Sequence, residues 1–219
     1  MSHVTLVRHG QANTAARDEA SYDRLSDLGR NQAQWLGEYF QGTGEVFARI
    51  YTGTMTRHIQ TEEEIGAKCP IEVVRDARLN EMPYFDLAKL MEEQHGAKVP
   101  QDREEFIPHL PLMFDKWQKN ELEGVSETCA EFEARTRDAL HEIAAGEGRA
   151  MVVTSGGWIG MAMRLTMRLD LTAWAHACLA IENTSLHRIQ PLSTGLVLTQ
   201  FNALPHLDTS ERAFARTHI

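Results

Sequence analysis

Short apolar runs alternate with longer amphipathic segments along most of the 219-residue chain. Apolar runs rich in β-branched residues predict buried strands, at residues 4–8, 48–52, 71–74 and 150–154. Apolar residues at helical spacing predict helices, at residues 28–40 after an N-cap at Ser26, 54–65, 129–145 and 157–168. Because strands and helices alternate in this way, we expect parallel strands joined by crossover helices.

The alternation lapses between residues 82 and 124, where several prolines and acidic helical pieces indicate an insertion. We expect this insertion to form a helical cap beside the functional site. Near the C-terminus, apolar runs at 185–189 and 196–201 flank a turn at 193–195 and predict a hairpin at the sheet edge. The expected architecture is a single α/β domain over residues 1–219. It is a three-layer α/β/α sandwich whose mostly parallel central sheet has an antiparallel edge.

Composition narrows the possible partners. The formal net charge of -9 disfavours nucleic acid and anionic membrane surfaces, because both require many basic side chains on one face. Cys69, Cys129 and Cys178 show neither the spacing of zinc ligands nor an even count for a disulfide framework. The first residues lack a secretory signal, and no run reaches membrane-spanning length, so we expect a cytoplasmic protein.

The tripeptide Arg8-His9-Gly10 directly follows the first predicted strand. A neutral imidazole can attack phosphorus and carry the phosphoryl group, while an adjacent guanidinium binds phosphate oxygens through paired charge-assisted hydrogen bonds. A glycine at this place lets the backbone approach an anion closely. The tripeptide therefore indicates phosphoryl-transfer chemistry.

Other polar residues follow the later predicted strands. Arg57 lies in the first turn of the helix after the second strand, where backbone N–H groups and the helix dipole favour anions. Glu81 comes after the third strand, and a buried carboxylic acid there can protonate a leaving alcohol. Ser155 and Gly156 begin the helix after the 150–154 strand, where a hydroxyl and backbone N–H groups can bind an anion.

Together these stretches resemble the histidine phosphatase superfamily, which is also called the phosphoglycerate mutase-like family. The resemblance rests on L-V-R-H-G-Q at 6–11, the helix start at 22–33, an arginine before Q-T at 57–61, L-x-E at 79–81 and the late strand ending in two glycines. It extends over most of the chain but does not include the insertion. It implies the fold of that family and a phosphatase reaction that needs no metal.

The resemblance also implies roles for individual residues. His9 would be the nucleophile, Arg8 and Arg57 would bind the phosphate, and Glu81 would be the proton donor. Asp86 and Glu127 are weaker alternatives for the donor. Asn13 is offset from the asparagine of the mutase-type motif and is carried over as a phosphate ligand, together with Ser155 and Gly156.

The main departure from the family is Ser155, because the family usually has a second histidine there. The sequence resembles a branch with R-H-G-Q-A near the start and T-S-G-G near the end, in which this serine is a regular feature. If the pocket merely lacks one donor, Ser155→His would raise activity. We expect His58 to be an ordinary exposed or partly buried histidine. His187 and His206 are expected to be hydrogen-bonded structural histidines.

The leading functional hypothesis is a metal-independent phosphomonoesterase that acts through a phosphohistidine on a small phosphorylated metabolite, with no cofactor. Its expected ligands are that substrate and inorganic phosphate. The alternatives are a catalytically impaired phosphate-binding protein, a phosphoglycerate mutase and a serine hydrolase built on Ser155. The last lacks the glycine that a nucleophile elbow needs at Val153. The sequence leaves the substrate and the oligomeric state open.

Overall fold

A six-stranded mixed sheet forms the centre of the computed structural model, which describes residues 3–13, 16, 18–67 and 72–218. The strand order is β3-β2-β4-β1-β5-β6. The first four strands in sequence are parallel: β1 (Val4–Arg8), β2 (Arg49–Thr52), β3 (Val74–Arg75) and β4 (Ala150–Thr154). The remaining hairpin is antiparallel: β5 (Leu186–Leu192) and β6 (Gly195–Ala203). The mostly parallel sheet with an antiparallel edge is confirmed.

The two central strands are buried on both faces. In β1, Val4 and Leu6 belong to one hydrophobic cluster, and Val7 belongs to the other. In β4, Val152 and Val153 divide between the same two clusters. Side chains of a strand alternate between the faces of a sheet, so an uninterrupted apolar run is what a strand with helices on both sides requires.

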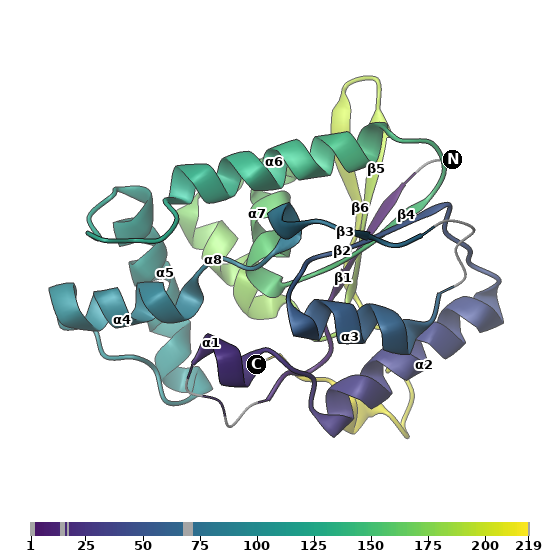
Figure 1. The fold of residues 1–219 in the computed structure, drawn as a ribbon, viewed down its shortest axis with the longest axis horizontal. Helices are drawn as coiled ribbons and strands as arrows, with labels where there is room; N and C mark the ends of the chain where they lie inside the picture. The colour runs from purple at the N-terminus through teal and green to yellow at the C-terminus, as the bar shows by residue number, and fades with distance from the viewer. Residues whose placement is uncertain (1–2, 14–15, 17, 68–71, 219) are drawn as a thin grey trace.

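Helices cover both faces of the sheet, as Figure 1 shows. On one face lie α2 (Asp27–Thr43) and α3 (Thr56–Ile65), which contribute Leu36, Phe40 and Ile65 to their cluster. On the other face lie α6 (Cys129–Ala145) and α7 (Gly156–Met167). The predicted three-layer arrangement is therefore confirmed.

The insertion contains the helices α4 (Tyr84–His95) and α5 (Arg103–Gln118), which lie beyond one end of the sandwich in Figure 1. It is joined to the core by aromatic packing onto α8 (Leu171–Ala180), where the rings of Phe114 and Trp174 stack with centroids 3.8 Å apart. Trp117 is also fully buried in this cluster. Such packing orders α5, whose residues face the functional site.

Some elements differ from the sequence prediction. The predicted strand at 71–74 corresponds to β3, which begins only at Val74, and residue 71 lies outside the described residues. Both β3 residues are exposed at the sheet edge, so no buried apolar pattern defines it. The short helix α1 (Glu19–Tyr22) and α8 were not predicted. Most residues of α8 are apolar, so it has no amphipathic period to detect.

His187 and His206 have the structural roles that the sequence predicted. The Nε2 atom of His187 lies 2.9 Å from the Ser185 hydroxyl, and its Nδ1 accepts a hydrogen bond from the Asn202 N–H. The His206 ring lies 2.8 Å from the Thr184 hydroxyl. Burial lowers the pKa of each to about 3, so both stay neutral. No helix in the described part of the chain is long and apolar enough to span a bilayer.

Candidate active site

A cavity of about 130 Å³ opens at the carboxyl ends of β1 and β4, between the sheet and the insertion. Its polar lining residues come from the ends of strands and the helices that follow them: Arg8, His9, Arg57, Glu81, Gly156 and Gly157. The remaining lining residues come from α1, the insertion and α8: Glu19, Tyr22, Met82, Tyr84, Phe85, Phe106, Leu110 and Cys178. The structure therefore brings His9, Arg8, Arg57, Glu81 and Gly156 together, as the sequence predicted.

His9 is held in one orientation by the loop that follows β1. Its backbone N–H donates to the Thr154 carbonyl at 2.9 Å, and its Nδ1 lies 2.7 Å from the Gly10 carbonyl. A carbonyl only accepts hydrogen bonds, so Nδ1 carries the proton and Nε2 keeps the lone pair. Burial, with Arg57 and Arg8 nearby, lowers the pKa of His9 well below its ordinary value. His9 is therefore a neutral imidazole whose Nε2 carries the lone pair.

The structure gives Gly10 a reason for being glycine in addition to the one expected. A Cβ atom there would collide with the backbone of Gly29 at the start of α2, and its N–H donates to the Thr61 hydroxyl at 3.0 Å. Its small size thus allows α2 to approach the loop, which fixes the loop against both covering helices. This contact positions His9.

Arg8 lies at the end of β1 and is only 6% exposed. One guanidinium nitrogen donates to the Ile181 carbonyl at 2.6 Å, while Nε has no hydrogen-bond partner among the described residues. A buried guanidinium with unused donors is costly unless an anion pairs with it. Arg8 thus presents a positive charge to the cavity at a place where a phosphate would compensate for the cost.

Arg57 is also buried and provides the second cation. Its Nη1 contacts Glu19 at 2.5 Å and Asp23 at 3.1 Å, and its guanidinium lies over the Tyr22 ring at 5.0 Å. The start of α3 is already occupied, because the Asp23 carboxylate accepts from the N–H groups of Thr56 and Arg57. The expectation that this helix start offers free backbone donors to substrate was therefore wrong, and only the side chain of Arg57 reaches the cavity.

Glu81 faces the start of α7. Its carboxylate accepts hydrogen bonds from the N–H of Gly157 at 3.1 Å and from the N–H of Met82 at 3.0 Å. Burial raises the pKa of Glu81, although those hydrogen bonds and the two arginines act against the shift. A Cβ on Gly157 would displace this carboxylate from its present position. The raised pKa favours the protonated form that a general acid needs.

The two alternative proton donors, Asp86 and Glu127, do not line the cavity. Glu127 forms an ion pair with Arg135 at 2.6 Å. Both acids line a hollow that adjoins the cavity and shares Glu81 with it. The structure also gives Asn13 a local structural contact, because its carboxamide donates to the Ser21 carbonyl at 2.9 Å and the residue does not line the cavity. The proposal of Asn13 as a phosphate ligand is corrected accordingly.

Ser155 and His58 depart most from the sequence expectations. Ser155 is fully buried and does not line the cavity, and its Oγ lies 2.6 Å from Nε2 of His58. His58 is likewise fully buried, and its ring centroid lies 5.7 Å from that of His9. The expectation of an exposed or partly buried His58 was wrong. Burial and the neighbouring Arg57 lower the pKa of His58 well below its ordinary value, so it too is neutral.

Sequence reasoning did not identify Glu19, Tyr22 and Asp23 as part of the site. All belong to α1 or the residue after it, and Tyr22 packs edge-on against the His9 ring with centroids 6.4 Å apart. The only available signal was the match of residues 22–33 to the family pattern. No cluster of three or more His, Cys, Asp or Glu side chains among the described residues has a metal-binding arrangement.

A model of branch 1 of the histidine phosphatase superfamily matches residues 4–204. The chain therefore belongs to this superfamily, and the class of fold and site described above is that of a histidine phosphatase. The match includes every strand and all of the cavity-lining residues.

Solved structures share the fold at low identity. A phosphoserine phosphatase mutant from Entamoeba histolytica, in complex with phosphoserine, is 19% identical, with a TM-score of 0.69 over 94% of this chain and all of that chain (100%). A mycobacterial glucosyl-3-phosphoglycerate phosphatase in complex with VO3 is 21% identical, with a TM-score of 0.64 over 93% of this chain and 100% of that chain. A putative alpha-ribazole-5'-P phosphatase from Escherichia coli is 16% identical, with a TM-score of 0.68 over 92% and 96%.

The contact between Glu19 and Arg57 predicts the direction of one binding change. Glu19→Gln removes a carboxylate from the anion site, so orthovanadate should bind roughly threefold to tenfold more tightly in isothermal titration calorimetry. The control is Asp18→Asn, which removes a nearby charge that does not touch Arg57 and keeps a residue able to cap α1. Weaker binding in Glu19→Gln would mean that the carboxylate orients Arg57 rather than competing with the anion.

Proposed function

We propose that the protein is a metal-independent phosphomonoesterase that acts through a phosphohistidine at His9. The observation that carries the proposal is the orientation of His9, whose Nδ1–H donates to Gly10 and leaves the Nε2 lone pair beside two buried arginines. Membership in a superfamily whose relatives include phosphatases supports it.

In the first step, Nε2 of His9 attacks phosphorus, and the P–N bond forms while the bond from phosphorus to the leaving oxygen breaks. Glu81 gives its proton to that oxygen, so the leaving group departs as a neutral alcohol. In the second step, water attacks the phosphohistidine, and the Glu81 carboxylate takes a proton from it. The P–N bond breaks, and inorganic phosphate, neutral His9 and protonated Glu81 are restored.

Arg8 and Arg57 bind the oxygens that gain charge as phosphorus is transferred. Both are held by fixed partners, Arg8 by the Ile181 carbonyl and Arg57 by Glu19 and Asp23. Preorganised cations of this kind stabilise a transition state because they need not reorient during the reaction. Gly156 at the start of α7 lies against Arg8 and extends the same anion-binding surface.

The pair formed by His58 and Ser155 replaces the second histidine of the family in this proposal. His58 Nδ1 has no partner among the described residues and lies against Gly53, where a Cβ would collide with it. The proton therefore belongs on Nε2, which donates to Ser155 Oγ, since an unpaired N–H is costlier to bury than an unpaired lone pair. The Ser155 hydroxyl accepts this hydrogen bond behind the cavity lining, so the pair would support the start of α7 rather than touch the phosphoryl group.

A serine hydrolase built on the same pair is disfavoured. Its nucleophile must reach the substrate, but Ser155 lies behind the cavity lining. Its histidine also needs an acid to hold Nδ1, and His58 Nδ1 has no such partner in the described structure. The contacts that place His9, Arg8, Arg57 and Glu81 around one cavity favour the phosphatase instead.

The nucleophile is tested by trapping. Protein mixed with 4-nitrophenyl [³²P]phosphate and quenched in alkali should carry label on His9, because phosphohistidine survives base and is lost in acid. His9→Ala should lose both the label and roughly a thousandfold or more of kcat/KM, and EDTA should change neither. His141→Ala, an exposed histidine on α6, is the control. Label retained in His9→Ala, or activity that needs added magnesium, would refute the mechanism.

The raised pKa of Glu81 predicts an alkaline limb in the pH profile. With an alkyl phosphate, kcat/KM should fall as pH rises through that pKa, because the protonated acid is the active form. The lowered pKa of His9 keeps the nucleophile neutral well below pH 6.5, so activity should persist on the acid side. Glu81→Gln should abolish the limb and slow alkyl phosphates far more than 4-nitrophenyl phosphate, whose leaving group needs no proton. An unchanged limb in Glu81→Gln would exclude Glu81 as the acid.

Moving the imidazole tests the roles of His58 and Ser155. His58→Ala should lower kcat by roughly tenfold to a hundredfold, less than the loss of a donor that contacts the phosphoryl group directly, because the pair acts through the start of α7. Ser155→His alone should destabilise the protein by about 1–3 kcal/mol rather than raise activity, because His58 already fills the space beside Ser155. The double variant His58→Ala/Ser155→His should recover kcat relative to His58→Ala. A well-folded double variant without recovery would contradict the replacement.

A further inference from the structure

We propose that the site selects phosphomonoesters of compact, apolar, uncharged alcohols, with aryl phosphates preferred. This inference rests on the proposed phosphatase function and adds the class of leaving group. It is carried by an apolar wall of the cavity that begins at Tyr22, beside Arg57, and continues into the insertion. That wall consists of aromatic and aliphatic side chains, most of them from the insertion: Tyr22, Met82, Tyr84, Phe85, Phe106 and Leu110.

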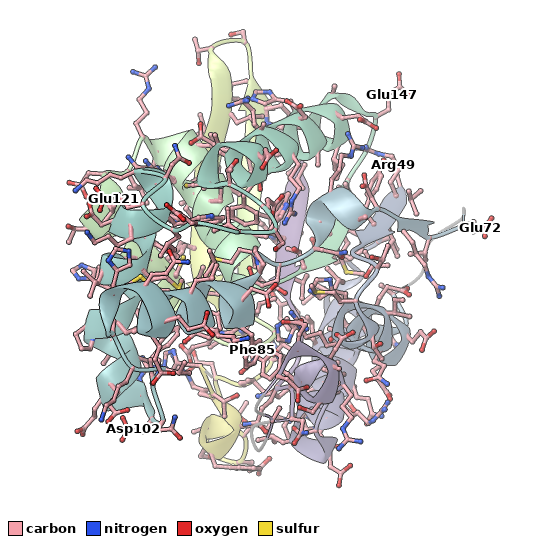
Figure 2. The ribbon with its side chains drawn as sticks, turned by 60° about the vertical axis from the view of Figure 1, so that its left-hand side comes forward. Arg49, Glu72, Phe85, Asp102, Glu121 and Glu147 are labelled. Atoms are coloured by element: carbon pink, nitrogen blue, oxygen red, sulfur yellow. The ribbon has the colours of Figure 1, made fainter. Side chains whose placement is uncertain are left out.

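The aromatic rings form a continuous row that begins at the nucleophile. The His9 ring meets Tyr22 edge-on, and Tyr22 meets Phe85 with centroids 5.7 Å apart. Phe85 then contacts Tyr84 at 5.6 Å, and Tyr84 contacts Phe106 at 5.5 Å. In the view of Figure 2, Phe85 lies on the side of α4 toward the body of the domain, whereas Asp102 and Glu121 lie at the outer edge of the insertion.

This row is suited to an apolar group. Edge-to-face rings present both faces and edges to a neighbouring ring, and such pairs are favourable beyond the area that they bury. Leu110 and Met82 are almost fully buried and close the same wall with aliphatic atoms. A leaving group that extends from a phosphoryl group at His9 Nε2 therefore meets apolar surface.

The charged side chains that line the cavity lie together at one end of it. Among the described residues that line the cavity, the charged side chains are Arg8, Arg57, Glu19 and Glu81, and all of them contact one another or the start of α7. None of the lining residues that the insertion contributes from α4 and α5 is charged. A second anionic group on the substrate, such as a carboxylate, would meet no cation among the described residues that line the aromatic side of this cavity.

The volume of the cavity suits a compact leaving group. Its volume of about 130 Å³ is close to that of the cavities of about 150 Å³ that take up benzene. The neighbouring structures bind or act on substrates with carboxylate groups, namely phosphoserine and glucosyl-3-phosphoglycerate. The aromatic wall gives this chain a different leaving-group preference within the same fold.

The experiment compares kcat/KM for phenyl phosphate, n-butyl phosphate, O-phosphoserine, 3-phosphoglycerate and phosphocholine, measured by release of inorganic phosphate. We expect kcat/KM for phenyl phosphate to exceed that for O-phosphoserine and 3-phosphoglycerate by roughly a hundredfold. The value for n-butyl phosphate should lie between that of phenyl phosphate and those of the two carboxylated substrates. A preference for phosphoserine or 3-phosphoglycerate would overturn the inference. A preference for phosphocholine would also overturn it, because the aromatic row would then serve a cation.

Variants of Phe106 test whether the aromatic wall of the cavity causes the preference for phenyl phosphate. Phe106→Ala should lower kcat/KM for phenyl phosphate roughly tenfold and leave that for O-phosphoserine nearly unchanged, since only the aryl group uses the ring. Phe106→Leu should recover part of the loss. The control is Ile107→Ala, the adjacent residue of α5, which is 45% exposed and does not line the cavity. Equal losses for both substrates in Phe106→Ala would contradict a role in selection.

The two proposals fail in different ways. If phosphate is released but carboxylated substrates are preferred, the leaving-group inference is wrong and the phosphatase function stands. If no ester is turned over, the phosphatase function is wrong. The wall is then still tested by calorimetry with phenylphosphonate and 2-carboxyethylphosphonate, which cannot be hydrolysed. Tighter binding of phenylphosphonate, reduced by Phe106→Ala, supports the inference, and equal affinities refute it.

Discussion

The parallel pairing of β1 with β4 is the constraint on which the site depends. Arg8 lies opposite Thr154 in the register, so the residues after both strands emerge at the same edge of the sheet. The His9 N–H extends the pairing by one more hydrogen bond, to the Thr154 carbonyl. His9 and the start of α7 are consequently neighbours although they lie far apart in sequence. Both strands are fully buried, which makes a shift of register costly because it would expose apolar side chains.

Burial then sets the chemistry of the groups at that edge. The same low-dielectric surroundings lower the pKa of His9 and raise that of Glu81, which favours the neutral imidazole and the protonated carboxyl group. The pKa values of the proposed nucleophile and the proposed proton donor are thus shifted in opposite directions within one cavity. Arg8 and Arg57 lower the pKa of His9 further, and they act against the rise in the pKa of Glu81. The arginines retain their charge, and the carboxylates of Glu19 and Asp23 partly neutralise Arg57 when no anion is bound.

The sequence predicted the sheet, the covering helices and the charged and polar residues at the strand ends, because those features follow from strong local patterns. A buried strand followed by Arg8-His9-Gly10 identifies both an element and its polar end. The helices α8 and α1 could not be predicted in the same way. Most residues of α8 are apolar, and α1 has a single turn whose place depends on contacts with Arg57 and His9.

The contact between His58 and Ser155 shows a second limit of sequence reasoning. Residue by residue, Ser155 indicates a missing histidine and His58 indicates a surface position. Only the three-dimensional structure places the two side chains in hydrogen-bond contact beside His9. The role of Gly10 was likewise visible only in the structure, where its neighbour is the backbone of Gly29. Both features depend on tertiary packing between segments that are distant in sequence.

A crystal structure of the protein with orthovanadate tests the central claim most directly. Vanadate mimics the phosphoryl group in transfer, so the position of vanadium reports where phosphorus would react. The account predicts a bond from vanadium to Nε2 of His9, with vanadate oxygens bound by Arg8 and Arg57 and one apical oxygen directed toward Glu81. Vanadium bonded to the Ser155 hydroxyl, or bound away from His9, would contradict it.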